Sequence, residues 1–148
     1  MNKRPLTMTD FANLLRDKGV NSTLQRVEIA QVILSKPQHL SAEQVLEKVN
    51  KGRNIVSKAT VYNTLRLFAQ KGLIKEIIAD PAKVFYEPMT TDHHHFYNVD
   101  TGELVDIDPG QIKIDGVPEP PDGSTPIGVD VVIRIRDGNI PKNSAPSA

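Results

Sequence analysis

Hydrophobic residues in the first half of the chain recur at the three- and four-residue spacing of amphipathic helices. Four segments show this pattern, and each would turn one apolar stripe toward a shared core. The predicted helices cover residues 9–18, 23–36, 41–49 and 57–72. Their inward-facing residues are expected to be Phe11, Leu14, Leu15, Val27, Ala30, Ile33, Leu34, Val45, Leu46, Val49, Val61, Leu65 and Phe68.

Polar residues at the ends of these segments support the same boundaries. Thr23 can cap the second helix with its hydroxyl, and Ser41 followed by Gln44 is a capping-box pattern at the start of the third. Gly19 and Gly72 follow the first and fourth segments, where a helix is expected to stop.

Two β-prone runs come directly after the fourth helix. Residues 73–79 and 84–86 are separated by Asp-Pro-Ala-Lys at 80–83, a composition typical of a turn. Short helices followed by a hairpin are the order of a winged helix-turn-helix domain. We therefore predict such a domain over residues 1–87.

The second half of the chain predicts fewer elements. Residues 96–99 and 103–107 form an expected hairpin, and residues 131–135 an expected last strand. Between them, four prolines at 118, 120, 121 and 126 disfavour a long helix. After the winged helix, the predicted parts of the chain are a hinge at 88–92, a second domain at 93–138 and a disordered tail at 139–148.

The amino-acid composition indicates a globular protein. The 148 residues are 39% hydrophobic and 24% charged, which is typical of a globular protein. No apolar run approaches the roughly eighteen residues that a membrane span requires, and the expected location is the cytoplasm. Cysteine is absent, which excludes disulfides and Cys-type structural zinc sites, so any metal must be held by nitrogen and oxygen.

Charge is distributed unevenly along the chain. Residues 1–87 carry 14 lysines and arginines against 8 acids, a balance of +6, whereas residues 88–148 carry 4 against 10, a balance of −6. A basic first half indicates a polyanion partner, although a solvated surface without a partner has the same composition.

The outer face of the fourth predicted helix has the residue types that bind DNA. Lysine and arginine neutralise phosphates or read guanine, asparagine pairs with adenine, and tyrosine can contact a thymine methyl. A polar solvated helix face is the alternative interpretation, and the hairpin that follows the helix favours DNA. The candidate DNA-binding residues are Ser57, Lys58, Thr60, Tyr62, Asn63, Arg66 and, at the hairpin tip, Lys83.

Three of the four histidines are consecutive, at His93, His94 and His95. Imidazole is the commonest side-chain metal ligand, so these residues are candidate ligands. The alternative interpretation is that they are solvated surface histidines without a ligand role. Because side chains alternate along an extended segment, His93 and His95 would share one face and His94 would lie on the other.

Several short motifs occur at separate places along the chain: Thr23-Leu-Gln-Arg26, His39-Leu-Ser-Ala-Glu43, Ala59-Thr-Val-Tyr62, Lys71-Gly-Leu-Ile74, Tyr86-Glu87 and the histidine cluster. Their order and spacing resemble those of the ferric uptake regulator family over roughly residues 8–107. This resemblance implies a dimeric bacterial transcription regulator with an α+β fold. The N-terminal domain would be a winged helix, and a small α/β domain would dimerise through its last strand.

The resemblance also implies a regulatory metal site at the hinge. Its ligand positions fall on His39, Glu87, His93, His95 and Asp106. Three imidazoles and two carboxylates suit a divalent ion such as Fe²⁺, Mn²⁺ or Zn²⁺.

Departures from the family pattern resemble one branch, the iron response regulators. The Cys-x-x-Cys found in most members is replaced by Asn98 and Thr101, so the structural zinc site is lost. The branch senses haem, and the implied candidates for haem binding are His93, His94 and His95. His94 could supply an axial ligand while its neighbours hold a metal.

The predicted function is a metal- or haem-responsive transcriptional regulator of iron homeostasis that binds A+T-rich operator DNA as a homodimer. One alternative is a manganese- or iron-dependent or peroxide-sensing repressor of the same family. No catalytic residues are predicted, and an enzyme here would have to be a metal-dependent hydrolase built on the same ligands.

Overall fold

The computed structural model describes residues 4–89 and 93–138. The chain forms two compact units, Met1–Thr90 and Thr91–Ala148. Part of the predicted hinge, residues 90–92, and the predicted tail, residues 139–148, lie outside the described residues. Among the described residues, no helix has the length and apolar character needed to cross a membrane.

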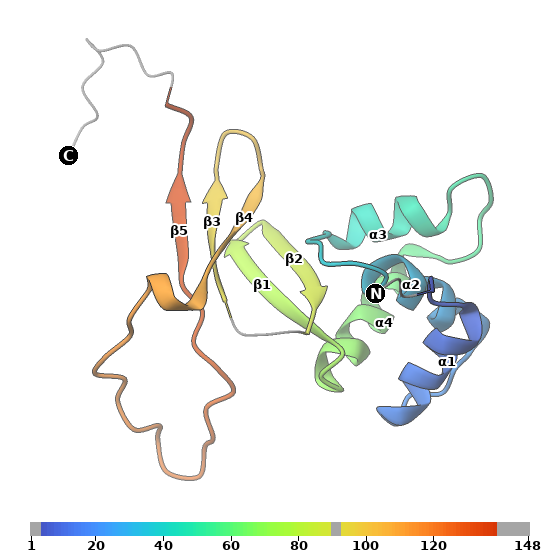
Figure 1. The fold of residues 1–148 in the computed structure, drawn as a ribbon, viewed down its shortest axis with the longest axis horizontal. Helices are drawn as coiled ribbons and strands as arrows, with labels where there is room; N and C mark the ends of the chain where they lie inside the picture. Colours follow the sequence, from blue (N-terminus) through green and yellow to red (C-terminus); the bar gives the residue numbers. More distant parts are fainter. Residues whose placement is uncertain (1–3, 90–92, 139–148) are drawn as a thin grey trace. The chain divides into compact units, whose positions relative to one another are not determined.

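The first unit begins with four helices, each close to its predicted range. They are α1 (Met8–Asp17), α2 (Leu24–Leu34), α3 (Ala42–Val49) and α4 (Lys58–Gln70) (Figure 1). Each helix follows a hydroxyl residue whose side chain accepts a hydrogen bond from the backbone three residues on. These caps satisfy amide groups that have no partner inside the helix, which fixes where each helix starts.

The four helices share one hydrophobic core. Phe11, Leu15, Ile33, Val61 and Phe68 are each at most 1% exposed. Leu14 was predicted to face inward and is instead 39% exposed, since α1 turns Phe11 and Leu15 into the core and packs Met8 and Ala12 at its edge. Leu34 and Leu46 are half-buried at the edge of the core.

A two-stranded antiparallel hairpin follows α4. Strand β1 (Ile74–Asp80) pairs with β2 (Lys83–Pro88), and the turn between them is closed by the Asp80 carboxylate, which accepts a hydrogen bond from the Ala82 amide at 2.8 Å. The helices and hairpin occur in the predicted order. A short bridge also joins Leu40 to Tyr86, with backbone N–O distances of 2.9 and 2.7 Å, and so fastens the start of α3 to β2.

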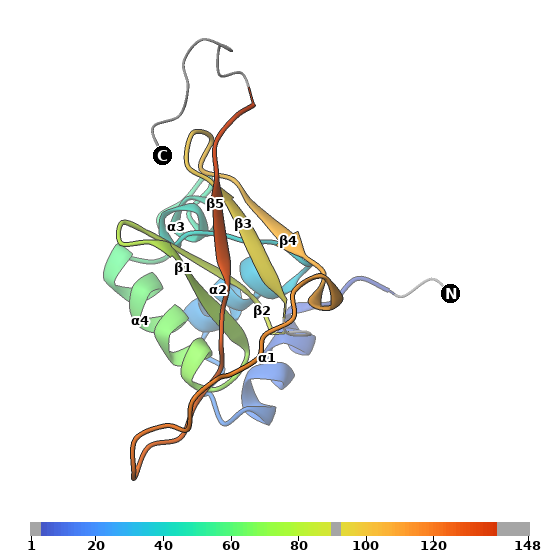
Figure 2. The same ribbon diagram turned by 90° about the vertical axis from the view of Figure 1, so that its left-hand side faces the viewer.

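The second unit is a three-stranded sheet. Strands β3 (His94–Asn98) and β4 (Leu104–Ile107) are antiparallel, and β5 (Val132–Ile135) runs parallel to β3 on its other side (Figure 2). A 3-10 turn, η1 (Pro109–Gln111), follows β4. The expectation of an α/β domain was wrong in one respect, because described residues 93–138 contain no α-helix. The prolines at 118, 120, 121 and 126 disfavour a helix in this segment.

The Ser41 cap provides a test of this folding scheme. Ser41 is 5% exposed, its Oγ accepts from the Gln44 amide at 3.2 Å, and the Gln44 side chain accepts from the Ser41 amide at 2.8 Å. We expect Ser41→Ala to lower the free energy of unfolding by about 1 kcal/mol, measured by urea denaturation. Ser35→Ala, at the exposed C-cap of α2, is the control and should change it by less. Equal unfolding midpoints for the two variants would contradict the capping role.

Candidate nucleic-acid interface and metal-ligand clusters

Most of the residues predicted to contact DNA lie on α4 or at its N-cap, and Lys83 lies at the hairpin tip. Lys58, Asn63 and Arg66 are exposed, whereas Thr60 and Tyr62 are half-buried. Ser57 is exposed but its hydroxyl is already engaged, accepting from the Thr60 amide at 3.1 Å and donating to the Thr60 hydroxyl at 2.9 Å. Lys58, Asn63 and Arg66 are therefore the most exposed of the candidate side chains on α4.

A network of hydrogen bonds to the preceding loop places the start of α4. The Asn50 amide oxygen accepts from the backbone of Ile55 at 2.9 Å and of Val56 at 3.0 Å, and its nitrogen donates to the Val56 carbonyl at 2.8 Å. From α2, the Gln25 side chain donates to the Ile55 carbonyl at 3.0 Å. The loop before α4 is thus held by side chains from α2 and from the end of α3, and this fixes where α4 begins.

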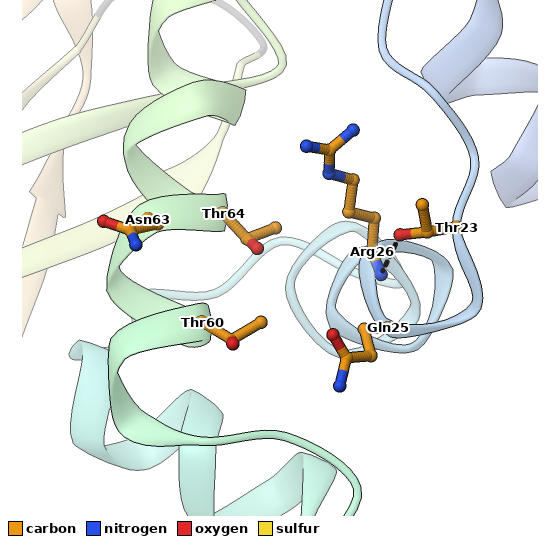
Figure 3. Close-up of a pocket in the computed structure, with 6 residues that line it drawn as sticks. All are labelled: Thr23, Gln25, Arg26, Thr60, Asn63 and Thr64. Carbon is orange, nitrogen blue, oxygen red and sulfur yellow. Dashed lines mark hydrogen bonds between the residues drawn. The ribbon is translucent and has the colours of Figure 1, made fainter.

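An open groove of about 300 Å³ lies between the start of α2 and α4. Figure 3 shows α4 contributing side chains on one side and the first turn of α2 on the other. Hydroxyl, amide and guanidinium groups line it, and no acidic residue does, so the groove suits an anion. Its lining residues are Thr23, Gln25, Arg26, Thr60, Asn63 and Thr64.

Four of these groove residues were not predicted as DNA contacts. Thr23, Gln25, Arg26 and Thr64 lie on or beside helices that the hydrophobic pattern did locate. From the sequence, Thr23 was predicted only to cap the second helix, and the structure confirms this cap. Only the packing of α2 against α4 shows that these polar groups share a surface with Asn63.

Tyr62 is held by a carboxylate from another helix. Its hydroxyl donates a short hydrogen bond to Glu43, in the first turn of α3, and the Lys58 ammonium lies 5.8 Å from the centre of its ring. This hydrogen bond lowers the pKa of Glu43, and the nearby Lys58 and Lys83 lower it further. The same hydrogen bond raises the pKa of Tyr62. Glu43 was not among the predicted site residues.

A histidine–carboxylate pair lies at the end of the hairpin in the first unit. His39 Nε2 is 3.3 Å from Glu87 Oε2, and Glu87 is 5% exposed. The Leu40–Tyr86 backbone bridge explains the pairing, because His39 directly precedes Leu40 and Glu87 directly follows Tyr86. A buried carboxylate beside a half-buried imidazole gives two of the predicted metal ligands a common location.

The second unit brings together three other predicted ligands. Asp106 Oδ1 lies 3.2 Å from His93 Nε2 and 3.4 Å from His95 Nε2, and the two rings are 4.7 Å apart. His95 and Asp106 are direct cross-strand partners, and His95 is only 2% exposed. His93, His95 and Asp106 each offer a ligand atom, all within 4.8 Å of one another, which is a suitable donor set for a divalent ion.

His94 points away from this cluster, as the alternation of a strand predicts. Its Nδ1 accepts a hydrogen bond from the backbone amide of Val131 at 3.1 Å. The lone pair of Nδ1 is engaged by this hydrogen bond, so Nδ1 is not available to bind iron in this arrangement. His94 therefore connects the sheet to the segment before β5.

Comparison with known proteins identifies the family. The profile described as "Ferric uptake regulator family" matches residues 17–116. The chain belongs to this family. Its members are metal-responsive transcriptional regulators, and this is the function class of the chain.

Individual relatives of this regulator fall in more than one branch. The peroxide operon regulator of Bacillus subtilis is 32% identical over 93 residues, covering 63% of this chain and 64% of that protein's length. The peroxide-responsive repressor of Staphylococcus aureus is 30% identical over 99 residues, 67% of each chain. The Pseudomonas aeruginosa ferric uptake regulator with manganese has a TM-score of 0.65 at 28% identity, covering 85% of this chain and 96% of that one. The iron response branch stays a prediction.

Proposed function

We propose that this regulator binds operator DNA through α4 and responds to a divalent metal ion in the control of iron homeostasis. The observation that carries the proposal is the exposed face of α4, where Lys58, Asn63 and Arg66 project beside an acid-free groove. Cations and amides at such a face match the phosphates and base edges of a major groove. The winged-helix interpretation adds Lys83, exposed at the start of β2, as a further phosphate contact.

Arg66→Ala tests this DNA interface. Loss of one phosphate contact should weaken binding to an A+T-rich palindromic duplex and lower the slope of log affinity against log salt by about one. Fluorescence anisotropy at several salt concentrations measures both. Lys113→Ala removes one exposed positive charge from the second unit and serves as the matched control. An unchanged slope in the Arg66 variant would show that α4 does not meet the phosphates.

For the regulatory ion, we propose that the two ligand clusters act together on one metal. His39 and Glu87 would supply ligands from the first unit, and His93, His95 and Asp106 from the second. Support comes from the chemistry of each cluster: imidazole nitrogens lie beside carboxylate oxygens, and the chain has no cysteine. Such donors suit Fe²⁺, Mn²⁺ or Zn²⁺. The bound ion would compensate the charge of both carboxylates.

Paired histidine variants test the metal proposal. His95→Ala should lower the affinity for Mn²⁺ by at least about tenfold, since even outer-shell substitutions at metal sites cost that much. His94→Ala should leave it unchanged, because His94 bonds Val131 instead. Isothermal titration calorimetry gives both affinities, and gel shifts with and without chelator show whether metal controls DNA binding. Equal losses in the two variants would refute the division of the histidines between two faces.

The haem-sensing alternative rests on the resemblance to the iron response branch. His94 in its present hydrogen-bonded state does not fit an axial ligand, because Nδ1 is already an acceptor. A haem titration of the same two variants distinguishes the branches. We expect no Soret shift that depends on His94, and a shift present in the wild-type protein but lost in His94→Ala would favour haem sensing.

We also propose that the regulator is a homodimer formed through the second unit. Phe96 pairs with Val105 on one side and Ile133 on the other, so these side chains lie on one face of the sheet. Val105 and Ile133 are 45% and 39% exposed, and Ile135, two positions along β5, is 38% exposed. An exposed apolar face of this kind marks an interaction surface.

Sedimentation velocity tests the dimer. Ile133→Asp places a charge in the apolar face and should shift the protein from the mass of two chains to the mass of one. Val117→Asp makes the same exchange at an exposed position outside the strands and should leave the mass unchanged. A two-chain mass in both variants would place the interface elsewhere.

A further inference from the structure

A carboxylate lies among the basic residues of the proposed DNA-binding surface. Glu43 is exposed at the start of α3 and accepts the hydrogen bond of the Tyr62 hydroxyl. Lys58 and Lys83, both candidate phosphate contacts, are close enough to favour its ionised form. A carboxylate at this place repels the phosphates of a polyanion, so a structural role is expected to offset that repulsion.

Stabilisation of α3 accounts for only part of this arrangement. A carboxylate in the first turn of a helix interacts favourably with the helix dipole, and Glu43 occupies that turn. That effect requires no particular partner for the side chain. Glu43 nevertheless reaches across to a residue 19 positions away on a different helix.

The contact restricts what Tyr62 can do. With its hydroxyl proton donated to Glu43, the phenol oxygen can act toward a ligand only as an acceptor, and the ring is held in one orientation. Lys58, on the ring at 5.8 Å, restrains it further. Tyr62 is thus arranged before any DNA arrives, which lowers the entropy lost when it makes a contact.

We propose that Glu43 is a positioning residue that sets the sequence preference of DNA binding by orienting Tyr62 against a base. The inference rests on the proposed function, because it assumes that α4 enters a DNA groove. Two consequences follow from the geometry. Removing Glu43 should reduce discrimination between sequences, and it should not reduce the general attraction to DNA, since a negative charge is lost from the surface.

The experiment compares two duplexes. One is selected from a random library by the wild-type protein, and the other is a scrambled duplex of the same composition. For Glu43→Ala we expect the ratio of the two affinities to fall about tenfold, the size of one lost base contact. Affinity for the scrambled duplex should stay the same or rise. Glu47→Ala, which removes an exposed acid one turn further along α3, is the matched control and should keep the wild-type ratio.

Two more variants separate positioning from simple stability. Glu43→Gln keeps an oxygen that can accept from the hydroxyl and should retain most of the preference. Tyr62→Phe keeps the ring but loses the hydrogen bond, so it should resemble Glu43→Ala, and the double variant should be no worse than either single one. Additive losses would show that the two side chains act independently.

Ultraviolet titration of tyrosine ionisation adds a readout that a purely structural role would not affect. The chain has three tyrosines, and the difference between the wild-type protein and Tyr62→Phe isolates the signal of Tyr62. Glu43→Ala should shift that signal to lower pH, because the carboxylate no longer opposes ionisation. An unshifted signal would overturn the proposed contact.

The outcomes for the two proposals are distinguishable. If the wild-type protein yields no preferred duplex, the proposed DNA-binding function fails. If it does, and Glu43→Ala keeps the wild-type ratio, the role of Glu43 is overturned. Equal loss of affinity for both duplexes, together with a lower unfolding temperature, would assign Glu43 to the stability of α3 alone and would also overturn the proposal.

Discussion

Two backbone hydrogen bonds between Leu40 and Tyr86 organise the first unit. They join the segment before α3 to the second strand of the hairpin, so a single bridge fixes both elements. On one side, the bridge brings His39 beside Glu87. On the other side, it fixes Ser41 and the start of α3, from which Glu43 reaches Tyr62. The candidate metal ligands and the candidate DNA surface of this unit therefore depend on the same short piece of sheet.

Helix α4 packs into the core with one face and exposes polar side chains on the opposite face. Val61, Leu65 and Phe68 are fully buried and hold the helix in the core, so the opposite face is free to carry Lys58, Asn63 and Arg66. Because the buried stripe fixes the rotation of the helix, these polar groups face solvent together. The groove beside α4 extends that surface onto α2. The proposed DNA-binding surface therefore spans two helices.

In the second unit, the alternation of a single strand separates the roles of three adjacent histidines. His95 lies on the face that contains Asp106, and His93 joins it there. His94, on the other face, bonds the backbone before β5. The candidate metal ligands therefore lie on one face of the sheet. His94 lies on the other face, together with the exposed apolar residues of β4 and β5. Binding of metal and self-association can therefore occupy opposite sides of one small sheet.

The sequence by itself determined the local structure: the four helices, their hydroxyl caps at Thr23 and Ser41, the hairpin and the opposite orientations of neighbouring histidines. These features follow from side-chain periodicity and from hydrogen bonds within three or four residues. Contacts between distant segments were decided by the tertiary structure alone. Glu43 meets Tyr62, Gln25 and Arg26 line a groove with Asn63, and Leu14 stays exposed because of how whole helices pack. Periodicity specifies which face of an element is apolar, but the partner of that face depends on packing across the entire core.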